Sequence, residues 1–161
     1  MDNTIYPEEW FDSWFDSPYY ELLYSKRDEW EARYFVQNLI LWLKPKPQSL
    51  ILDVGCGKGR YSKILADMDF RVTGIDISTS SLNIARKMEN ERLHFFKHDM
   101  RKPFLQNHFD YAFNFFTSFG YFNTLKEHHD ALHSIVQSLK HQGILVIDYL
   151  NVDYAAKHLL N

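Results

Sequence analysis

A run of alternating glycines behind a short apolar segment constrains this chain more than any other feature. Gly55, Gly57 and Gly59 take three of its six glycines, and they follow the apolar residues 50–52 and the acid Asp53. An apolar run that ends in glycine is typical of a buried strand turning sharply into a helix. One glycine would suffice for such a turn, and bare backbone also lets a ligand approach closely. The segment DVGCGKG therefore predicts a strand, a tight turn and a ligand against that turn.

The rest of the chain alternates between the periods of strands and helices. Short apolar runs predict strands at residues 50–54, 71–75, 93–97, 109–114 and 144–150. Helical spacing of apolar residues predicts helices at 60–68, 78–90 and 125–139, with Ser78 or Ser80 as an N-cap and Gly143 as a C-cap. This order predicts a doubly wound, Rossmann-like α/β fold with a mostly parallel sheet.

The first 47 residues have a different character from the rest. Residues 28–43 show helical spacing and end at the proline-rich stretch KPKPQ, and residues 1–27 predict one or two shorter helices broken at Pro18. The length of 161 residues suits one domain better than two. We therefore expect a single domain, with an N-terminal helical cap (1–47) and a Rossmann-like core (48–161).

Charge and composition exclude several kinds of partner. The net charge is −3 and no run of like charges forms a basic footprint, so we expect no nucleic-acid ligand. The lone cysteine, Cys56, rules out an internal disulfide and fits a reducing compartment. Neither a signal peptide nor an apolar run long enough to cross a membrane is legible. The sequence thus predicts a cytoplasmic protein without a membrane partner.

The spacing of the glycines narrows the choice of ligand. The dinucleotide fingerprint G-x-G-x-x-G requires a third glycine where this chain has Arg60. The P-loop G-x-x-x-x-G-K-[ST] requires a glycine five residues before Gly57 and a Ser or Thr after Lys58, and this chain has neither. Neither phosphate-binding motif fits, which argues against a nucleotide-dependent oxidoreductase.

The pattern D-x-G-x-G-x-G after a strand resembles the first motif of the class I S-adenosylmethionine-dependent methyltransferases. Further landmarks follow in the order of that family. Asp76 ends the second strand 21 residues after Gly55, at the place of the family's ribose-binding acid, and Asp99 follows the third strand, where the family reads the adenine amine. The segments FDYAFNFFTSFGYF and QGILVIDYLN are similar to its fourth strand with the following loop and to its fifth strand.

The resemblance implies a cofactor site for S-adenosylmethionine, with S-adenosylhomocysteine as product. Arg27, Arg33 or Arg60 is a candidate donor for its carboxylate, and Phe115, Phe116, Tyr19 or Tyr24 for the face against its sulfonium. The residues expected at the cofactor are Asp53, Gly55, Cys56, Gly57, Gly59, Asp76, Ile77, Asp99, Met100, Phe115, Tyr24 and Arg27. The catalytic residues remain open.

Several of these residues also fit other roles. Asp76 could serve as a helix N-cap and Asp99 as a solvated loop acid. Phe115 and Phe116 could pack in the core. His129 and His133 share a helix face, but no third ligand accompanies them, so we expect no metal site.

The C-terminal part of the family's pattern is not visible. Members usually carry seven strands, of which five are legible here, so the chain is either truncated or naturally short. An unpaired edge strand invites pairing with another chain, which predicts a homodimer through that edge.

The resemblance implies S-adenosylmethionine-dependent methyl transfer to a small-molecule acceptor, as in bacterial members of unassigned specificity. A catalytically incomplete cofactor-binding or assembly module is the alternative, and an oxidoreductase fits less well.

Overall fold

A computed structural model describes residues 10–158 except for 16, 18, 20–28 and 117. The strands are β1 (Leu50–Val54), β2 (Arg71–Asp76), β3 (Leu93–Lys97), β4 (Phe109–Asn114) and β5 (Leu139–Ile147). The helices are α1 (Trp10–Phe15), α3 (Glu29–Leu43), α4 (Arg60–Asp67), α5 (Thr79–Ala85), the 3₁₀ helix η1 (Arg86–Met88), α6 (Leu125–Ser138) and α7 (Val152–His158).

Within the described residues the strands form one sheet in the order β3-β2-β1-β4-β5. All neighbouring strands are parallel, with Ile51 opposite Val72 on one side and Tyr111 on the other. The direction in which successive strands are added reverses at β1: β2 and β3 lie on one side of it, and β4 and β5 lie on the other. The predicted doubly wound fold is confirmed, and β1, β3 and β4 have the predicted boundaries.

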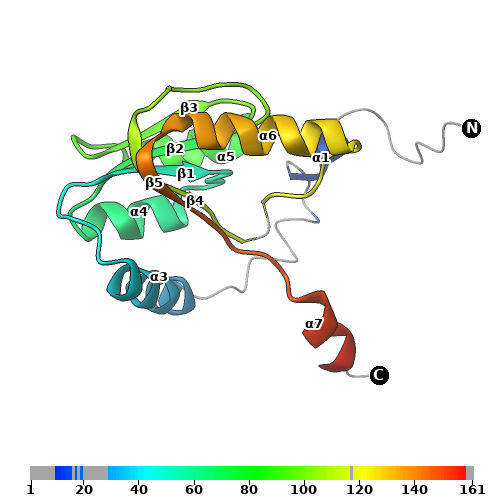
Figure 1. Ribbon diagram of the computed structural model, residues 1–161, viewed down its shortest axis with the longest axis horizontal. Coiled ribbons are helices and arrows are strands. Elements are labelled where there is room, and N and C mark those ends of the chain that lie inside the picture. The colour runs from blue at the N-terminus through cyan, green and yellow to red at the C-terminus, as the bar shows by residue number, and fades with distance from the viewer. Residues whose placement is uncertain (1–9, 16, 18, 20–28, 117, 159–161) are drawn as a thin grey trace, which may run out of the picture.

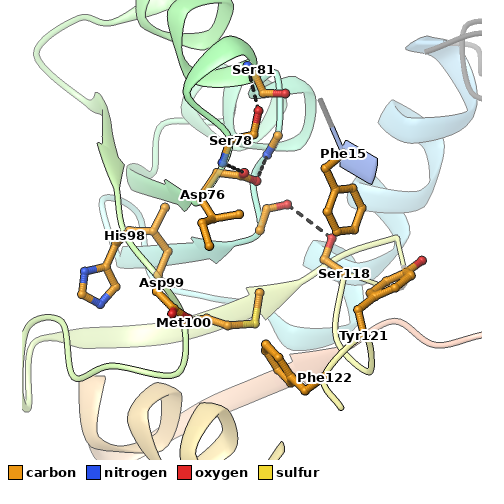
Figure 2. Close-up of a pocket in the computed structure, with 14 residues that line it drawn as sticks. Phe15, Asp76, Ser78, Ser81, His98, Asp99, Met100, Ser118, Tyr121 and Phe122 are labelled. Carbon is orange, nitrogen blue, oxygen red and sulfur yellow. Dashed lines mark hydrogen bonds between the residues drawn. The ribbon is translucent and has the colours of Figure 1, made fainter. Parts of the chain in front are cut away.

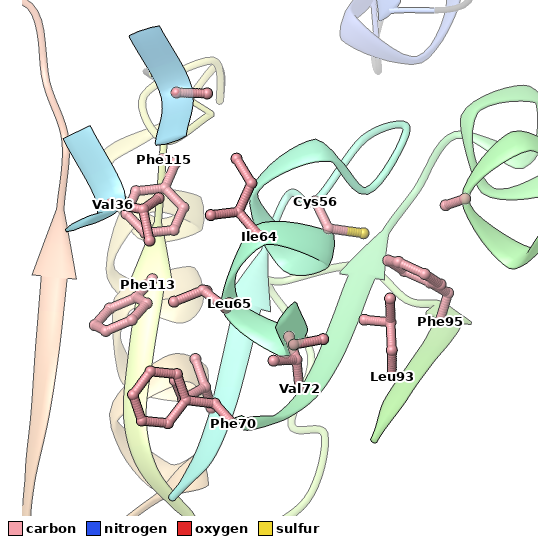
Figure 3. Close-up of a cluster of buried hydrophobic side chains, with 14 of the residues drawn as sticks. Val36, Cys56, Ile64, Leu65, Phe70, Val72, Leu93, Phe95, Phe113 and Phe115 are labelled. Atoms are coloured by element: carbon pink, nitrogen blue, oxygen red, sulfur yellow. The ribbon is translucent and has the colours of Figure 1, made fainter. Parts of the chain in front are cut away.

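Helices cover both faces of this sheet. Figure 1 shows α3 and α4 on one side and α6 on the other. The face under α4 carries the larger core, which includes Ile64 and Leu65 of α4, Leu82 of α5 and Phe95 of β3. Figure 3 shows Ile64, Leu65 and Phe95 in this core, between the helix and the strands. The second core lies under α6, where Ile135 meets Leu52, Val54 and Phe109. Strands covered on both faces explain why their apolar runs do not alternate.

The helices that follow β1 and β2 begin directly at the carboxyl ends of these strands. Gly59 is the N-cap residue of α4 with a φ of 80°. Ser78 is the N-cap of α5, and its hydroxyl accepts the backbone N–H of Ser81 at 3.1 Å. Ser78, one of the two predicted candidates, is thus the cap. Ser78 and Ser81 at the start of α5 lie at the crevice at which the strand order reverses, the usual ligand position in such sheets.

The fifth strand and the helix before it differ from the prediction. The helix ends at Ser138, the capping position is Leu139, and Gly143 lies inside β5, so the prediction of Gly143 as a C-cap is wrong. Leu139 pairs with Phe109 before an irregularity in the register, and pairing resumes with Ile144 opposite Tyr111. The strand ends at Ile147, and one further backbone bond, from the Asp148 N–H to Asn114 O, joins the next residue to β4.

The N-terminal prediction is tested only in part. α3 begins at Glu29, one residue after the predicted start, and ends at Leu43 as expected. α1 is a short helix in the region predicted to be helical, while Pro18 lies outside the described residues.

The sheet ends in β3 on one side and β5 on the other. After β5 the chain runs to α7, which stands apart from the sheet in Figure 1 and has no buried residue. No helix among the described residues is both long and apolar enough to cross a membrane.

Candidate functional site

A pocket opens at the carboxyl ends of β1, β2, β3 and β4, above the reversal of strand order (Figure 2). Four segments build its wall: the glycine turn after β1, the end of β2 with the start of α5, the loop after β3, and the loop after β4. Phe15 of α1 adds a side chain from the N-terminal region. The lining residues are Phe15, Gly55, Gly57, Ile75, Asp76, Ile77, Ser78, Ser81, His98, Asp99, Met100, Ser118, Tyr121 and Phe122.

Asp76 joins two of these segments. One carboxylate oxygen accepts the backbone N–H of Gly57 at 2.7 Å, and the other accepts the backbone N–H of Ser78 at 2.8 Å. Figure 2 shows the Asp76 carboxylate beside Ser78 at the pocket wall, with its hydrogen bonds as dashed lines. Asp76 also lines the pocket, where a carboxylate oxygen is a hydrogen-bond acceptor for a ligand.

The three glycines of the turn all have a positive φ, but the space around them differs. A Cβ on Gly55 would lie 2.7 Å from Ser118 Cβ, and one on Gly59 would lie 2.6 Å from the ring of Phe95. A Cβ on Gly57 would meet nothing within 4 Å. Gly55 and Gly59 are therefore required by packing within the protein, whereas Gly57 presents bare backbone to open space in the pocket.

Asp53 lies below the turn, not at its surface. The side chain is 1% exposed and accepts a hydrogen bond from the buried hydroxyl of Ser62 on α4. Burial raises the pKa of Asp53 to about 7, and the negative charge of Asp76 acts in the same direction while the Ser62 hydrogen bond opposes it. Asp53 thus fixes the first turn of α4 under the glycine turn.

Cys56 is also buried. Its sulfur would lie 2.9 Å from a Cβ on Gly74 of β2, and burial raises the pKa of its thiol. A protonated, enclosed thiol is a packing group and a poor nucleophile.

Asp99 is held by its neighbour two residues on. Arg101 donates its backbone N–H at 2.9 Å and its Nε at 3.0–3.1 Å, and a terminal guanidinium nitrogen approaches to 2.7 Å. Arg101 also reaches Glu127 Oε1 on α6 at 2.6 Å. Asp99, Arg101 and Glu127 form an ion-pair chain from the pocket wall to α6, which we call the Asp99–Glu127 chain.

The loop after β4 is tied down at its start. Asn114 Nδ2 donates to Val54 O at 2.7 Å, and its buried Oδ1 has no hydrogen-bond partner among the described residues. Phe116 has a φ of 62°, which is unusual for a bulky side chain, and its N–H donates to Asp148 Oδ2 at 2.9 Å. Ser118 Oγ donates to Phe115 O at 2.9 Å and lies 3.3 Å from Gly55 O. These bonds bring the loop after β4 against the glycine turn.

Aromatic side chains close the side of the pocket next to α1. The ring centroid of Tyr121 lies 5.1 Å from that of Phe15 and 5.9 Å from that of Trp10. Phe15 and Tyr121 both line the pocket. This wall joins the N-terminal helix to the loop after β4.

The structure brings half of the predicted cofactor residues to this pocket, places four more outside its lining and does not describe the remaining two. The lining includes Gly55, Gly57, Asp76, Ile77, Asp99 and Met100. Asp53, Cys56 and Gly59 support the turn from below, whereas Phe115 is 2% exposed and packs against Phe113, Tyr61 and Phe35. Tyr24 and Arg27 lie outside the described residues.

The other candidates for the sulfonium and the carboxylate lie away from the lining. Tyr19 is exposed, and Arg33 faces Glu29 and Asp67 at 3.7 and 4.0 Å. The guanidinium of Arg60 lies 4.8 Å from the centre of the Tyr61 ring.

Sequence reasoning missed eight lining residues, namely Phe15, Ile75, Ser78 as a wall residue, Ser81, His98, Ser118, Tyr121 and Phe122. His98 was next to a predicted acid and could have been added on adjacency alone. Ser118 was a small polar residue inside an aromatic run, which is the one local signal that marked the loop. Phe15 carried no such signal, because it is far in sequence from the other lining residues and only tertiary packing brings it to the site.

Comparisons with known proteins agree with this architecture. Residues 51–143 match the model of the family described as methyltransferase domain. The matched segment spans β1 to the middle of β5 and includes the glycine turn, Asp76 and Asp99. The chain belongs to this family.

Two curated relatives illustrate the range of this methyltransferase domain. A candidate methyltransferase of Geobacillus sp. (strain WCH70) is 32% identical over 154 residues, which are 94% of this chain and 60% of that protein. A malonyl-[acyl-carrier protein] O-methyltransferase of Acetivibrio thermocellus is 37% identical over 66% of this chain and 37% of its own length. The chain thus spans 60% or less of either relative.

Solved structures of similar proteins have the same fold. The S-adenosylmethionine-bound amino pentose methyltransferase CalS10 of Micromonospora echinaspora is 28% identical, with a TM-score of 0.67 over 83% of this chain and 57% of its own. DesVI of Streptomyces venezuelae is 27% identical, with a TM-score of 0.67 over 81% of this chain and 56% of its own.

Proposed function

We propose that this chain binds S-adenosylmethionine in the pocket at the carboxyl ends of β1 to β4 and transfers its methyl group to a small-molecule acceptor. Membership in the methyltransferase-domain family supports the reaction class. The Asp76 carboxylate is the observation that carries the proposal, because it lines the pocket while it is held by the N–H groups of Gly57 and Ser78. A fixed acceptor of this kind suits the paired hydroxyls of a ribose.

The residues present fit the cofactor. Gly57 leaves open space where any side chain would project, so an extended ligand can pass along the backbone of the turn. Asp76 and Asp99 are two acceptors on neighbouring segments of one wall, suited to a ribose and to an exocyclic amine. The apolar side chains of Ile77, Met100 and Phe122 lie along the same wall and suit the faces of a purine.

When bound, S-adenosylmethionine supplies an electrophilic methyl group. The contribution of the chain to an in-line displacement is positioning. The glycine turn, Asp76 and Asp99 hold the donor, and the aromatic wall of Phe15 and Tyr121 excludes water from the side next to α1. A base is needed only when the acceptor must lose a proton, and we assign none.

The activities of two relatives support an acceptor group of low molecular weight. The Acetivibrio protein is a malonyl-[acyl-carrier protein] O-methyltransferase, and CalS10 is an amino pentose methyltransferase. The acceptor atoms therefore differ between relatives of one domain, and the net charge of −3 favours an acceptor other than nucleic acid.

Calorimetry with S-adenosylhomocysteine tests the proposal, with NADH as the control ligand. We expect a dissociation constant in the micromolar range for S-adenosylhomocysteine and no heat from NADH. Binding of NADH alone would favour an oxidoreductase, and binding of neither would refute the cofactor site. Binding without transfer of labelled methyl in a broad acceptor screen would favour the catalytically incomplete module.

We further propose that the chain acts as a homodimer in the cytoplasm of a bacterium. The edge position of β5 supports the dimer, because backbone groups on its outer side are open to pairing with a second chain. A buried, protonated Cys56 is compatible with a reducing compartment. Light scattering at tens of micromolar should report twice the mass of 19.3 kDa, and a monomer would refute the dimer.

A further inference from the structure

Arg101 does not line the pocket but contacts two residues that do, from different loops. Its guanidinium binds Asp99 from the loop after β3 and lies 5.4 Å from the ring centre of Phe122 in the loop after β4. Figure 2 shows Asp99 and Phe122 on either side of Met100. Side chains of both partners are largely shielded from solvent, with 16% of Arg101 and 14% of Asp99 exposed.

The contacts of Arg101 determine how the Asp99 carboxylate can act. A carboxylate has about four acceptor sites. Arg101 occupies most of them with its backbone N–H, its shared Nε–H and one terminal N–H. One acceptor site is left for a ligand, and the side chain cannot rotate without breaking several charge-assisted hydrogen bonds.

The same contacts keep Asp99 ionised. Partial burial raises the pKa of Asp99, but the hydrogen bonds and the charge of Arg101 outweigh it, so the pKa lies below its usual range. An ionised carboxylate only accepts hydrogen bonds. It therefore favours a donor at the ligand position that it faces and repels a carbonyl oxygen there.

Glu127 completes the arrangement from the other side. It accepts from Arg101 at 2.6 Å, and it also closes a capping box with Thr124 at the start of α6. Arg101 is thus held between two acids and is anchored to a helix. The contacts to Asp99 and Glu127 therefore fix the orientation of the guanidinium, unlike that of a flexible surface arginine.

We propose that Arg101 is a positioning residue that makes the pocket selective for a 6-aminopurine over a 6-oxopurine. The inference rests on the proposed function, since it concerns the purine of the bound adenosyl ligand. Arg101 aims one acceptor site of Asp99 at the exocyclic amine and supports the ring of Phe122 beside it. A rotated carboxylate could instead accept the ring N–H of a 6-oxopurine, and the fixed rotamer prevents this.

Binding of two ligands that differ only at position 6 tests the role of Arg101. S-Adenosylhomocysteine and S-inosylhomocysteine are titrated into the wild-type chain and into Arg101→Met, Arg101→Lys and Arg92→Met. Arg92 is the matched control, because it pairs with Asp69 at an exposed site at the amino end of β3. Thermal melts establish that each variant is folded.

We expect wild type to prefer the adenosyl ligand by at least about tenfold, the effect of one charge-assisted hydrogen bond. Arg101→Met should weaken the adenosyl ligand about tenfold and change the inosyl ligand less than about threefold, so the preference collapses. Arg101→Lys should restore part of the preference, because an ammonium keeps the charge without the bidentate fork. Arg92→Met should behave as wild type.

Three results would overturn the inference, and each differs from the others. Equal weakening of both ligands in Arg101→Met, with Arg101→Lys agreeing, would mean a general structural role. Tighter binding of the adenosyl ligand in Arg101→Met would mean that Arg101 competes with the ligand for Asp99. Absence of binding of either ligand to the wild type would refute the proposed function, and this inference with it.

Discussion

Asp76 Oδ2 accepts the backbone N–H of Gly57 at 2.7 Å, which ties the last residue of β2 to the middle of the glycine turn after β1. The bond spans 19 positions of sequence and fixes both the acceptor and the bare backbone at one point of the pocket wall. The glycine turn and Asp76, which are separate features of the sequence, therefore form one part of the pocket wall.

Replacing Asp76 by Ala should remove the ribose acceptor and free the N–H of Gly57. We expect the affinity for S-adenosylhomocysteine to fall by about 1.5–3 kcal/mol, the value of hydrogen bonds to a charged group. Calorimetry measures this change, and Asp130→Ala, at an exposed ion pair with Lys126 on α6, is the control. An unchanged affinity in Asp76→Ala would mean that the ribose is not held there.

Alanine at Gly57 and at Gly59 should separate ligand binding from stability. A Cβ at Gly57 enters open pocket space, so Gly57→Ala should lose about 1–2 kcal/mol of stability through its positive φ and most of the ligand affinity. Gly59→Ala carries the same backbone penalty and also places its Cβ 2.6 Å from Phe95, so it should lose more stability. Denaturant melts and calorimetry on both variants test the contrast. Equal losses of stability in the two variants would contradict it.

Asp53 should make the stability of the protein fall between about pH 4 and pH 7. Its pKa is about 7 in the folded state, because burial outweighs the Ser62 hydrogen bond, and near 3.9 when unfolded. In this window the native state binds the extra proton, so the free energy of unfolding decreases as the pH rises and levels off above pH 7. The shift corresponds to about 4 kcal/mol.

Asp53→Asn keeps an acceptor for Ser62 and cannot ionise. The difference in unfolding free energy between this variant and wild type, measured by urea melts from pH 4 to pH 8, isolates the contribution of Asp53 from that of other carboxylates. We expect the free energy of unfolding of Asp53→Asn to increase relative to that of wild type as the pH rises. Parallel curves would mean that Asp53 titrates normally.

Asp148 should matter for the loop after β4 although it does not line the pocket. Its Oδ2 is the acceptor for Phe116 N–H, which holds the left-handed conformation at φ 62°. Asp148→Ala should cost about 1–2 kcal/mol of stability and raise the dissociation constant for S-adenosylhomocysteine a few-fold, because Ser118 and Tyr121 follow directly. Asp148→Asn, which keeps an acceptor oxygen, should retain most of both, and Asp153→Ala on exposed α7 should be silent. A silent Asp148→Ala would show that the loop is held elsewhere.

Much of the fold could be predicted because its signals are local. Buried strands appear as apolar runs, and a helix that starts at a parallel strand's end appears as glycine or serine in the next few residues, as at Gly59 and Ser78. The boundaries of β5 were missed because Leu139 pairs with Phe109 through an irregular register, which no period in the sequence marks. Glycine is the residue type preferred after a helix C-terminus, but Gly143 lies inside that irregular strand.

By itself, the sequence determined that the glycine turn, Asp76 and Asp99 lie at the carboxyl ends of strands, because each stands at or just after the end of an apolar run. The tertiary structure alone decided that Phe115 is buried while Ser118 and Tyr121 face the pocket, and that Phe15 reaches it. It also decided the bonds from Arg101 to Glu127 and from Phe116 to Asp148, each between separate segments of the fold. Periodicity encodes how a segment folds locally, whereas such contacts depend on how segments pack, which no local pattern carries.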